Sequence, residues 1–199
     1  IRDDQTVKIF KLMAETDMLR RAATPQPNSD NFRQWEVAGS SHVDVPFEIE
    51  YGKVRAQQAG LAMDSVTPRE SGCDLPAYST VPFRDVMNAA FQHMVRWIDD
   101  GVAPPTAEPI RLTRAYPTPE FARDAQGNVL GGIRLAEHAV PTAKNTGVNT
   151  GANRFCFLYG SHEDFDTETL NSLYASKESY RSEERRVGNE CRSRWSPFH

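Results

Sequence analysis

The chain has 199 residues and a net charge of −4 at pH 7, with 25% charged and 39% hydrophobic residues. This composition is typical of a soluble globular protein that forms one domain or part of one. No apolar run reaches the roughly 18 residues that a membrane span needs, and the acidic balance provides no basic surface for nucleic acid.

Two strands are predicted near the start of the chain. Residues 6–15, TVKIFKLMAE, hold apolar residues in a nearly continuous run, which is typical of a strand buried on both faces of a parallel sheet. Turn chemistry with two prolines follows over residues 24–31. Residues 32–39, FRQWEVAG, form the second predicted strand. The region 43–80 gives a poor signal, with a short helix expected over 51–60.

The clearest predicted element is a helix over residues 80–101. Its apolar residues recur at steps of three and four, so they line one face that we expect to cover the sheet. Pro82 suits the first helical turn, and Gly101 suits the position just past the end. We expect His93 to lie at the edge of this face, partly exposed or bordering the core. The apolar face consists of Phe83, Val86, Met87, Ala90, Phe91, Met94, Trp97 and Ile98.

A smaller β-rich stretch is predicted after this helix. Residues 121–135 indicate a hairpin with its turn at the letters DAQGN, and residues 153–160 form another apolar run. A last helix begins near Asp166, which is placed as its N-cap. Phe165 and Leu170 are placed as a hydrophobic staple across that helix start.

The final residues, 181–199, differ in character from the rest of the chain. They hold five Arg and three Glu but no Lys and no Asp, and they show neither a helical nor a strand period. One interpretation is a disordered basic tail. We prefer another, because the stretch closely resembles a translated sequencing-adapter oligonucleotide. We therefore expect a natural domain over residues 1–180 and a non-native tail over 181–199 that packs against nothing.

Outside that tail the chain has two cysteines, Cys73 and Cys156. Two thiols are too few for a disulfide scaffold, and they lack the CxxC spacing of a zinc site. From the sequence alone they are either one disulfide or two separate buried thiols. No cofactor or metal site is predicted.

Acidic side chains follow the first predicted strand, and a histidine follows the second. We expect Glu15 and Asp17 in the loop at a carboxyl strand end, where open α/β sheets keep their active sites. His42 follows the small residues 39–41, which permit a tight turn. A carboxylate beside this imidazole would accept its Nδ1 proton and stabilise the imidazolium. Taken singly, the aspartate could be a turn residue and the histidine a surface residue, but their places on consecutive strand ends favour a pair.

The chain resembles the C-terminal part of the proteins known as the alpha/beta hydrolase domain family. The resemblance rests on the stretches ETDML, FRQWEVAGSSHVD, VMNAAFQHMVRWIDDGVAPP, GNVLGGIR, VPTA, FCFLYG and TLNSLY, which together run through most of residues 1–180. It implies an α/β fold, made of the last parallel strands and covering helices of a hydrolase with a small β-rich extension.

The same resemblance implies roles for individual residues. Asp17 matches the acid and His42 the base of a Ser–Asp–His triad, in which the acid precedes the base along the chain. Glu15 is the weaker candidate for the acid. Cys73 and Cys156 match positions where the family leads us to expect a paired cysteine.

The nucleophile is not found in the sequence. No G-x-S-x-G motif occurs, and Ser40 and Ser41 lie too close to His42 along one loop to be taken for the nucleophile. We expect the nucleophile before Ile1, in a missing N-terminal part of the same domain. Two functions follow: a serine hydrolase acting on a small-molecule ester or amide, or a hydrolase-fold protein that binds without catalysis. A serine in an upstream strand–turn–helix elbow would favour the enzyme.

Overall fold

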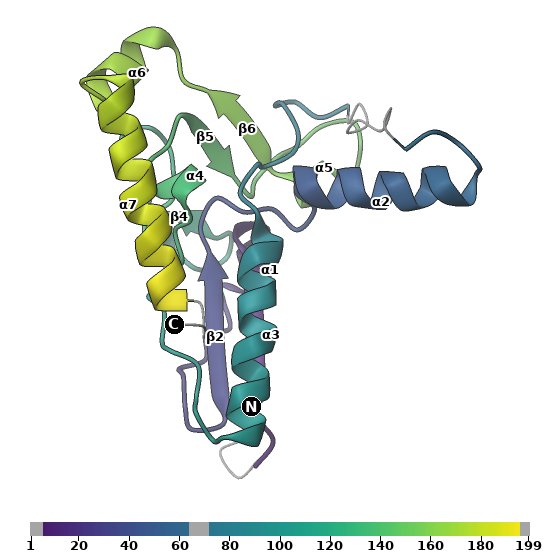
Figure 1. Ribbon diagram of the computed structural model, residues 1–199, viewed down its shortest axis with the longest axis vertical. Helices are drawn as coiled ribbons and strands as arrows, with labels where there is room; N and C mark the ends of the chain where they lie inside the picture. The colour runs from purple at the N-terminus through teal and green to yellow at the C-terminus, as the bar shows by residue number, and fades with distance from the viewer. Residues whose placement is uncertain (1–5, 64–71, 196–199) are drawn as a thin grey trace.

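The computed structural model describes residues 6–63 and 72–195, which form small sheets surrounded by helices (Figure 1). Within these ranges, no helix combines the length and the apolar character that crossing a membrane requires. In chain order the elements are β1 (Ile9–Ala14), α1 (Glu15–Arg21), β2 (Phe32–Val37), α2 (Val45–Gln58), α3 (Phe83–Asp99), β3 (Leu112–Arg114), β4 (Glu120–Phe121), α4 (Ala136–Ala139), β5 (Ala143–Thr146), α5 (Cys156–Tyr159), β6 (Ser161–Asp164), α6 (Thr167–Leu173) and α7 (Lys177–Trp195).

The two predicted strands, β1 and β2, pair in parallel as expected. Their register places Ile9 opposite Phe32 and Ala14 opposite Val37, so both strands end at the same level. A single parallel bridge from Val37 to Ile133 extends this sheet. The other pairs, β3 with β4 and β5 with β6, are antiparallel. The chain is therefore mixed α/β, with its parallel part confined to β1 and β2 and a β-rich region after them.

Helix α3 packs on the parallel sheet with a narrower face than the sequence predicts. Its buried residues are Val86, Ala90, His93 and Trp97. His93 is only 7% exposed and meets the ring of Trp35 edge-on, so of its two predicted placements it borders the core and is not partly exposed. The predicted apolar face is also divided, because a two-stranded sheet is too narrow to cover it. Part of that face stays exposed, namely Met87, Phe91 and Ile98.

The residues after β1 form a helix instead of the predicted loop. Helix α1 begins directly at Glu15, and its first turn holds Glu15 and Asp17. Carboxylates are favoured there because the free backbone amides of a helix N-terminus are partly positive. One oxygen of Asp17 accepts a 2.9 Å hydrogen bond from the Ala14 amide, which closes the first turn. The first turn of α1 thus fixes the positions of both acidic residues.

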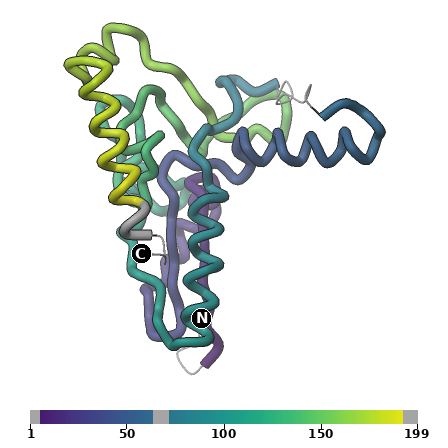
Figure 2. Tube along the Cα trace, viewed as in Figure 1, coloured from purple at the N-terminus to yellow at the C-terminus, as the bar shows by residue number. Residues whose placement is uncertain are grey.

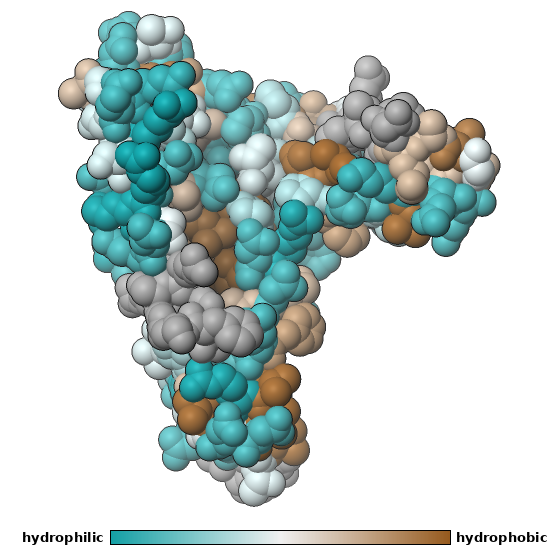
Figure 3. Space-filling model, viewed as in Figure 1, coloured by the Kyte–Doolittle hydropathy of each residue, from teal (hydrophilic) through white to brown (hydrophobic). Residues whose placement is uncertain are grey.

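Helix α2 begins earlier than the predicted helix and projects as an arm from the rest of the molecule (Figures 1 and 2). Asp44 is its N-cap and accepts a hydrogen bond from the Phe47 amide at 2.7 Å. The arm carries exposed hydrophobic residues, including Tyr51 and Val54, each 49% exposed. Hydrophobic side chains are visible along it in Figure 3. The arm buries little of its surface against the remainder of the described chain.

The β-rich region follows the prediction at its turn but not along its whole length. The amide of Gly127 donates to the carbonyl of Asp124, which forms the expected turn. Phe121, however, pairs with β3, and the predicted hairpin is reduced to one bridge between Arg123 and Val129. The apolar run at 153–160 contains the single helical turn α5, not a strand. At the start of α6, Asp166 caps the helix as predicted.

The prediction that residues 181–199 pack against nothing is wrong for the part that the structure describes. Helix α7 continues to Trp195, and Val187 is only 7% exposed. Cys191 packs against the hydrophobic cluster around Trp35, and its thiol lies 3.3 Å from the Arg134 carbonyl oxygen. Ion pairs of Arg186 with glutamates three and four residues away support the helix. The prediction considered only the spacing of apolar residues, so it did not detect this support. Residues 196–199 lie outside the described residues.

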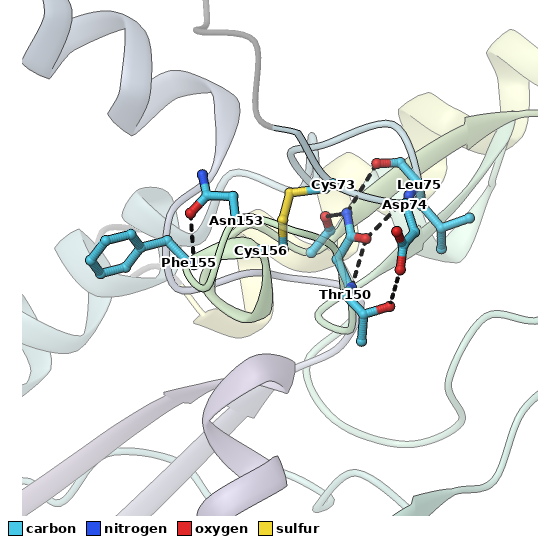
Figure 4. The surroundings of a disulfide bond; sticks show 9 residues. Cys73, Asp74, Leu75, Thr150, Asn153, Phe155 and Cys156 are labelled. Atoms are coloured by element: carbon cyan, nitrogen blue, oxygen red, sulfur yellow. Dashed lines mark hydrogen bonds between the residues drawn. A yellow bond between two sulfur atoms is a disulfide. The ribbon is translucent and has the colours of Figure 1, made fainter.

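Cys73 and Cys156 form a disulfide, which confirms the pairing that the family resemblance implied (Figure 4). Their Cα atoms are 5.5 Å apart. The bond joins the segment before α3 to α5, and a hydrogen bond of 2.7 Å between the Thr150 hydroxyl and Asp74 lies beside it. Disulfides persist in oxidising compartments and are rare in the reducing cytosol.

Replacing both Cys73 and Cys156 with serine should lower the free energy of unfolding. The two residues are 83 positions apart, and a crosslink of that span restricts the unfolded chain by about 4–5 kcal/mol in the loop-closure description. Urea unfolding followed by circular dichroism measures the change. Cys191→Ser is the matched control, since Cys191 takes no part in the disulfide. Equal stability of the double variant and the control would contradict the prediction.

The adapter origin of residues 181–199 is a separate prediction. The packing of α7 does not test this origin. Val187 and Cys191 lie one helical turn apart, and two apolar side chains at that spacing can pack on one side of a helix whatever the source of the sequence. Amplification and sequencing of the locus from source DNA tests the origin. We expect the natural reading frame to depart from this sequence after Tyr180, and a genomic frame that encodes all 19 residues would refute it.

Candidate functional site

Asp17 and His42 meet at the carboxyl ends of the two parallel strands. The Nδ1 atom of His42 lies 3.1 Å from an oxygen of Asp17, so the two side chains form the pair that the sequence predicts. Asp17 comes from the first turn of α1, and His42 from the loop after β2. The other Asp17 oxygen is held by the Ala14 amide, so the carboxylate is fixed from two sides. This geometry leaves Nε2, on the opposite side of the imidazole ring, facing away from Asp17.

Glu15 does not contact the imidazole, unlike Asp17. Its side chain is fully buried, and its oxygens accept hydrogen bonds from the Gly39 amide at 2.9 Å and from Arg123 at 3.0 Å. Burial raises the pKa of the Glu15 carboxyl group, while Arg123 and the amides of Gly147 and Gly39 act in the opposite direction. Of the two acidic candidates, Asp17 is therefore the one positioned to orient His42.

The loop that carries His42 depends on glycine at position 39. Gly39 has a φ of +69°, and a Cβ atom there would lie 2.4 Å from Nδ1 of the buried His138. Ser40 and Ser41 follow, and their hydroxyls donate to the carbonyls of Val37 at 2.7 Å and Val43 at 2.9 Å. Both hydroxyls are thus engaged by the backbone of their own loop. The small residues permit the tight turn that the sequence predicted.

A cavity of about 910 Å³ opens beside the Asp17–His42 pair. Its walls come from β1, α2, α3 and α5 and are mainly apolar, with Phe10, Leu12 and Phe91 among them. Arg84 is a cationic residue in its lining. The arrangement places a group that can transfer a proton beside a space suited to an apolar substituent. The sequence pattern had assigned the apolar α3 side chains of this lining, such as Phe91, to the core. The cavity was therefore not predicted.

Asp44 ties the cavity walls to the His42 loop. Besides capping α2, it accepts a hydrogen bond of 3.1 Å from the Phe83 amide at the start of α3. Asp44 is 3% exposed, and burial raises its pKa while its two amide partners oppose that shift. One buried carboxyl group therefore holds the beginnings of two helices next to His42.

A second histidine–carboxylate pair, His162 and Asp164, lies outside the cavity lining. Their closest atoms are 3.1 Å apart, and Nδ1 of His162 contacts Asn145 and Thr80. Among the residues that the structure describes, no group of three or more His, Cys, Asp or Glu side chains is placed to hold a metal ion. The described chain thus has two histidine–aspartate pairs, of which the first lines the cavity described above.

Comparison with known proteins gives one family match. The sequence model described as "Alpha/beta hydrolase domain" matches residues 1–194. This match covers the two parallel strands, the Asp17–His42 pair and the disulfide. Neither the search of curated proteins nor the search of solved structures found a match.

His138, which lies against Gly39, should make the stability of the protein depend on pH. It is fully buried, Nε2 lies 2.9 Å from the Val129 carbonyl oxygen, and burial lowers the pKa of His138 from 6.5 to about 4. The unfolded chain therefore binds the proton first as the pH falls. Relative to neutral pH, the folded state should lose up to about 3 kcal/mol between pH 6.5 and 4 through this group.

Comparison with His138→Gln isolates this effect, because glutamine can donate to Val129 but does not titrate. Burial raises the pKa values of Glu15, Glu36 and Asp44, which therefore favour folding at low pH and lose that contribution as the pH rises through their folded pKa values. Both proteins share these carboxyl groups, so they cancel in the difference. Urea unfolding from pH 4 to 7 measures it. A stability difference that stays constant over this range would contradict the prediction.

Proposed function

We propose, because the chain belongs to the alpha/beta hydrolase domain family, that it supplies the acid and the base of a serine hydrolase that cleaves carboxylic esters or amides. The observation that carries this proposal is the 3.1 Å contact of Asp17 with Nδ1 of His42 beside an apolar cavity. Family membership alone would support only a hydrolase fold, because one fold hosts many functions. The site geometry supplies the chemical argument.

The proposed chemistry assigns one proton path to His42. Its Nε2 atom takes the proton of the nucleophilic serine hydroxyl as the hydroxyl oxygen attacks the substrate carbonyl. The same atom then gives that proton to the leaving alcohol or amine. Asp17 accepts the Nδ1–H hydrogen bond throughout, which fixes the tautomer of the ring and stabilises the imidazolium between the two transfers.

The nucleophile is proposed to come from a segment outside these 199 residues, in an N-terminal part of the same domain. Within residues 6–63 and 72–195, no hydroxyl group forms a hydrogen bond with Nε2 of His42. Among the described strands, β1 pairs only with β2, so one edge of β1 is available for another strand. Helix α3 contacts β1, and its Ile98, which is 61% exposed and lies outside the cavity lining, suits a surface that further protein covers.

The cavity favours a small substrate with an apolar group next to the scissile bond. Its lining beyond the Asp17–His42 pair comes mainly from apolar side chains of β1, α3 and α5, such as Leu12, Met94 and Leu158. Burial of an apolar acyl or alcohol group there would contribute roughly 25 cal/mol for each Å² removed from water. No cofactor has a role in this proposal.

Binding without catalysis is the second candidate function. The observation that favours it is that Nε2 of His42 has no hydroxyl partner among the described residues. In that case Asp17 and His42 would persist as a surface pair, and the cavity would bind a ligand that is not cleaved. Activity measurements on the complete domain separate the two functions.

The 199-residue chain alone should hydrolyse p-nitrophenyl esters no faster than its His42→Ala variant. Co-expressed with the upstream part of its domain, it should become active, and His42→Ala or Asp17→Asn should then reduce kcat/KM by roughly 10³–10⁴-fold. The physical reason is that an acid–base pair without a nucleophile and oxyanion hole lacks most of the catalytic stabilisation.

His162→Ala is the matched control for this experiment. It removes a histidine whose aspartate contact has the same length, 3.1 Å, but which lies outside the cavity lining. We expect this variant to retain activity. An assembled domain without activity, or with activity that His42→Ala leaves unchanged, would reject the hydrolase proposal and favour binding.

A further inference from the structure

We propose that Glu15 and Thr16 are positioning residues that hold the His42 loop so that its imidazole meets Asp17. The proposal rests on the proposed function, since positioning has meaning only if the Asp17–His42 pair acts. It concerns different atoms, however, and can fail while the hydrolase proposal stands.

Three consecutive side chains of α1 contact the loop at successive points. Glu15 accepts from the Gly39 amide at 2.9 Å. The Thr16 hydroxyl oxygen accepts from the His42 amide at 3.3 Å, and Asp17 contacts the His42 ring at 3.1 Å. The first turn of α1 therefore holds the backbone of the loop at Gly39 and at His42, and it also holds the His42 side chain.

The Thr16 hydroxyl is oriented by a second partner. Its proton is donated to the Gly147 carbonyl at 2.8 Å, so its lone pairs are free to accept the His42 amide proton. Thr16 is only 3% exposed, and a Cβ atom on Gly147 would lie 2.4 Å from the Thr16 amide nitrogen. This close approach of two backbones places one hydroxyl between the β5 end and the His42 loop.

Glu15 is oriented by Arg123, which reaches it from the β-rich region. The guanidinium donates to Glu15 at 3.0 Å and to the Gly127 carbonyl at 2.9 Å. Arg123 is 27% exposed, whereas Glu15 is completely buried. The carboxylate thus joins α1, the Gly39 amide and the turn at 124–128. The loop that carries His42 is held to a segment more than 80 residues farther along the chain.

The Asp17–His42 pair needs this support because it is exposed. The side chains are 29% and 55% exposed, respectively. Ion pairs and hydrogen bonds open to water hold their partners weakly, since water competes for the same groups. The Glu15 contact with the Gly39 amide is buried and the Thr16 contact with the His42 amide is partly buried, so water competes less for them. They therefore determine how often the ring occupies the position from which Nδ1 reaches Asp17.

Nuclear magnetic resonance of the ¹⁵N-labelled chain tests the proposal without requiring activity. Ring ¹H–¹⁵N correlations report the tautomer of His42, and hydrogen exchange reports the protection of its backbone amide. Thr16→Val keeps the shape of the side chain and removes both hydrogen bonds, while Thr16→Ser keeps the hydroxyl. Glu15→Gln removes the charge that pairs with Arg123, and Asp17→Ala defines complete loss of the ring contact.

We expect the unchanged chain and Thr16→Ser to hold His42 in the Nδ1–H tautomer. In Thr16→Val the His42 amide should exchange at least about tenfold faster, and the tautomer should shift toward the mixture seen in Asp17→Ala. Glu15→Gln should shift the tautomer in the same direction. If Glu15→Gln does not fold, the Thr16 pair decides the test, because valine and threonine have nearly the same shape.

The outcomes separate the two proposals. Thr16→Val with the tautomer and exchange of the unchanged chain would overturn the positioning role and leave the hydrolase proposal intact. An unchanged chain without a preferred Nδ1–H tautomer, and insensitive to Asp17→Ala, would remove the geometric basis of both. A shift in Thr16→Ser equal to that in Thr16→Val would also overturn the proposal, because the hydroxyl would then not be responsible.

Discussion

The parallel pairing of β1 with β2 is the constraint on which the rest of the site depends. The register sets Ala14 opposite Val37, so the residues that follow each strand emerge side by side. Neighbouring strands lie only about 4.8 Å apart, which lets short side chains meet across the gap. A slip of one residue would turn β1 over, because side chains alternate between the two faces of a strand. It would also displace Asp17 from His42, so the core and the site require the same register.

That register is maintained by a core centred on Trp35 of β2. Trp35 is fully buried, meets Phe10 of β1 at a centroid distance of 4.8 Å, and donates from its indole to the Pro105 carbonyl at 2.8 Å. Val86 and Ala90 of α3 cover it. Truncation of a buried aromatic side chain of this kind costs about 3–5 kcal/mol of unfolding free energy. Trp35 alone therefore contributes much of the stability that keeps β1 and β2 in register.

The sequence allowed the strands, the long helix and the Asp17–His42 pair to be predicted because each depends on local pattern. Apolar runs and periodic residues report burial directly, and the two polar residues lie where strands end. The α1 helix was missed because Glu15 and Asp17 were interpreted as loop residues, although carboxylates also favour a helix start. The helix over 181–195 was missed for a related reason, since charge pairs support it.

Contacts between distant segments could not be predicted in the same way. Glu15 and Arg123 are separated by 108 positions, and neither residue type signals a buried partner from its own neighbourhood. The width of the covered α3 face depends on how many strands lie beneath it, so helical periodicity alone assigned Phe91 and Ile98 to the core. The disulfide was suggested only by family resemblance, since two cysteines carry no pairing information by themselves.

The structure separates the groups proposed for chemistry from those that hold the fold. Asp17 and His42 are partly exposed, and exposed pairs of this kind contribute about 0.2–1 kcal/mol to stability. Glu15 is buried with Arg123, and removing one partner of a buried pair costs about 3–5 kcal/mol, because the other charge is left unpaired. Substitution of the proposed acid or base should therefore cost little stability, whereas substitution of Glu15 should cost more. Two acidic residues of one helical turn thus differ in what their substitution affects. Substitution of Asp17 should affect the proposed chemistry, and substitution of Glu15 should affect the stability of the fold that presents Asp17.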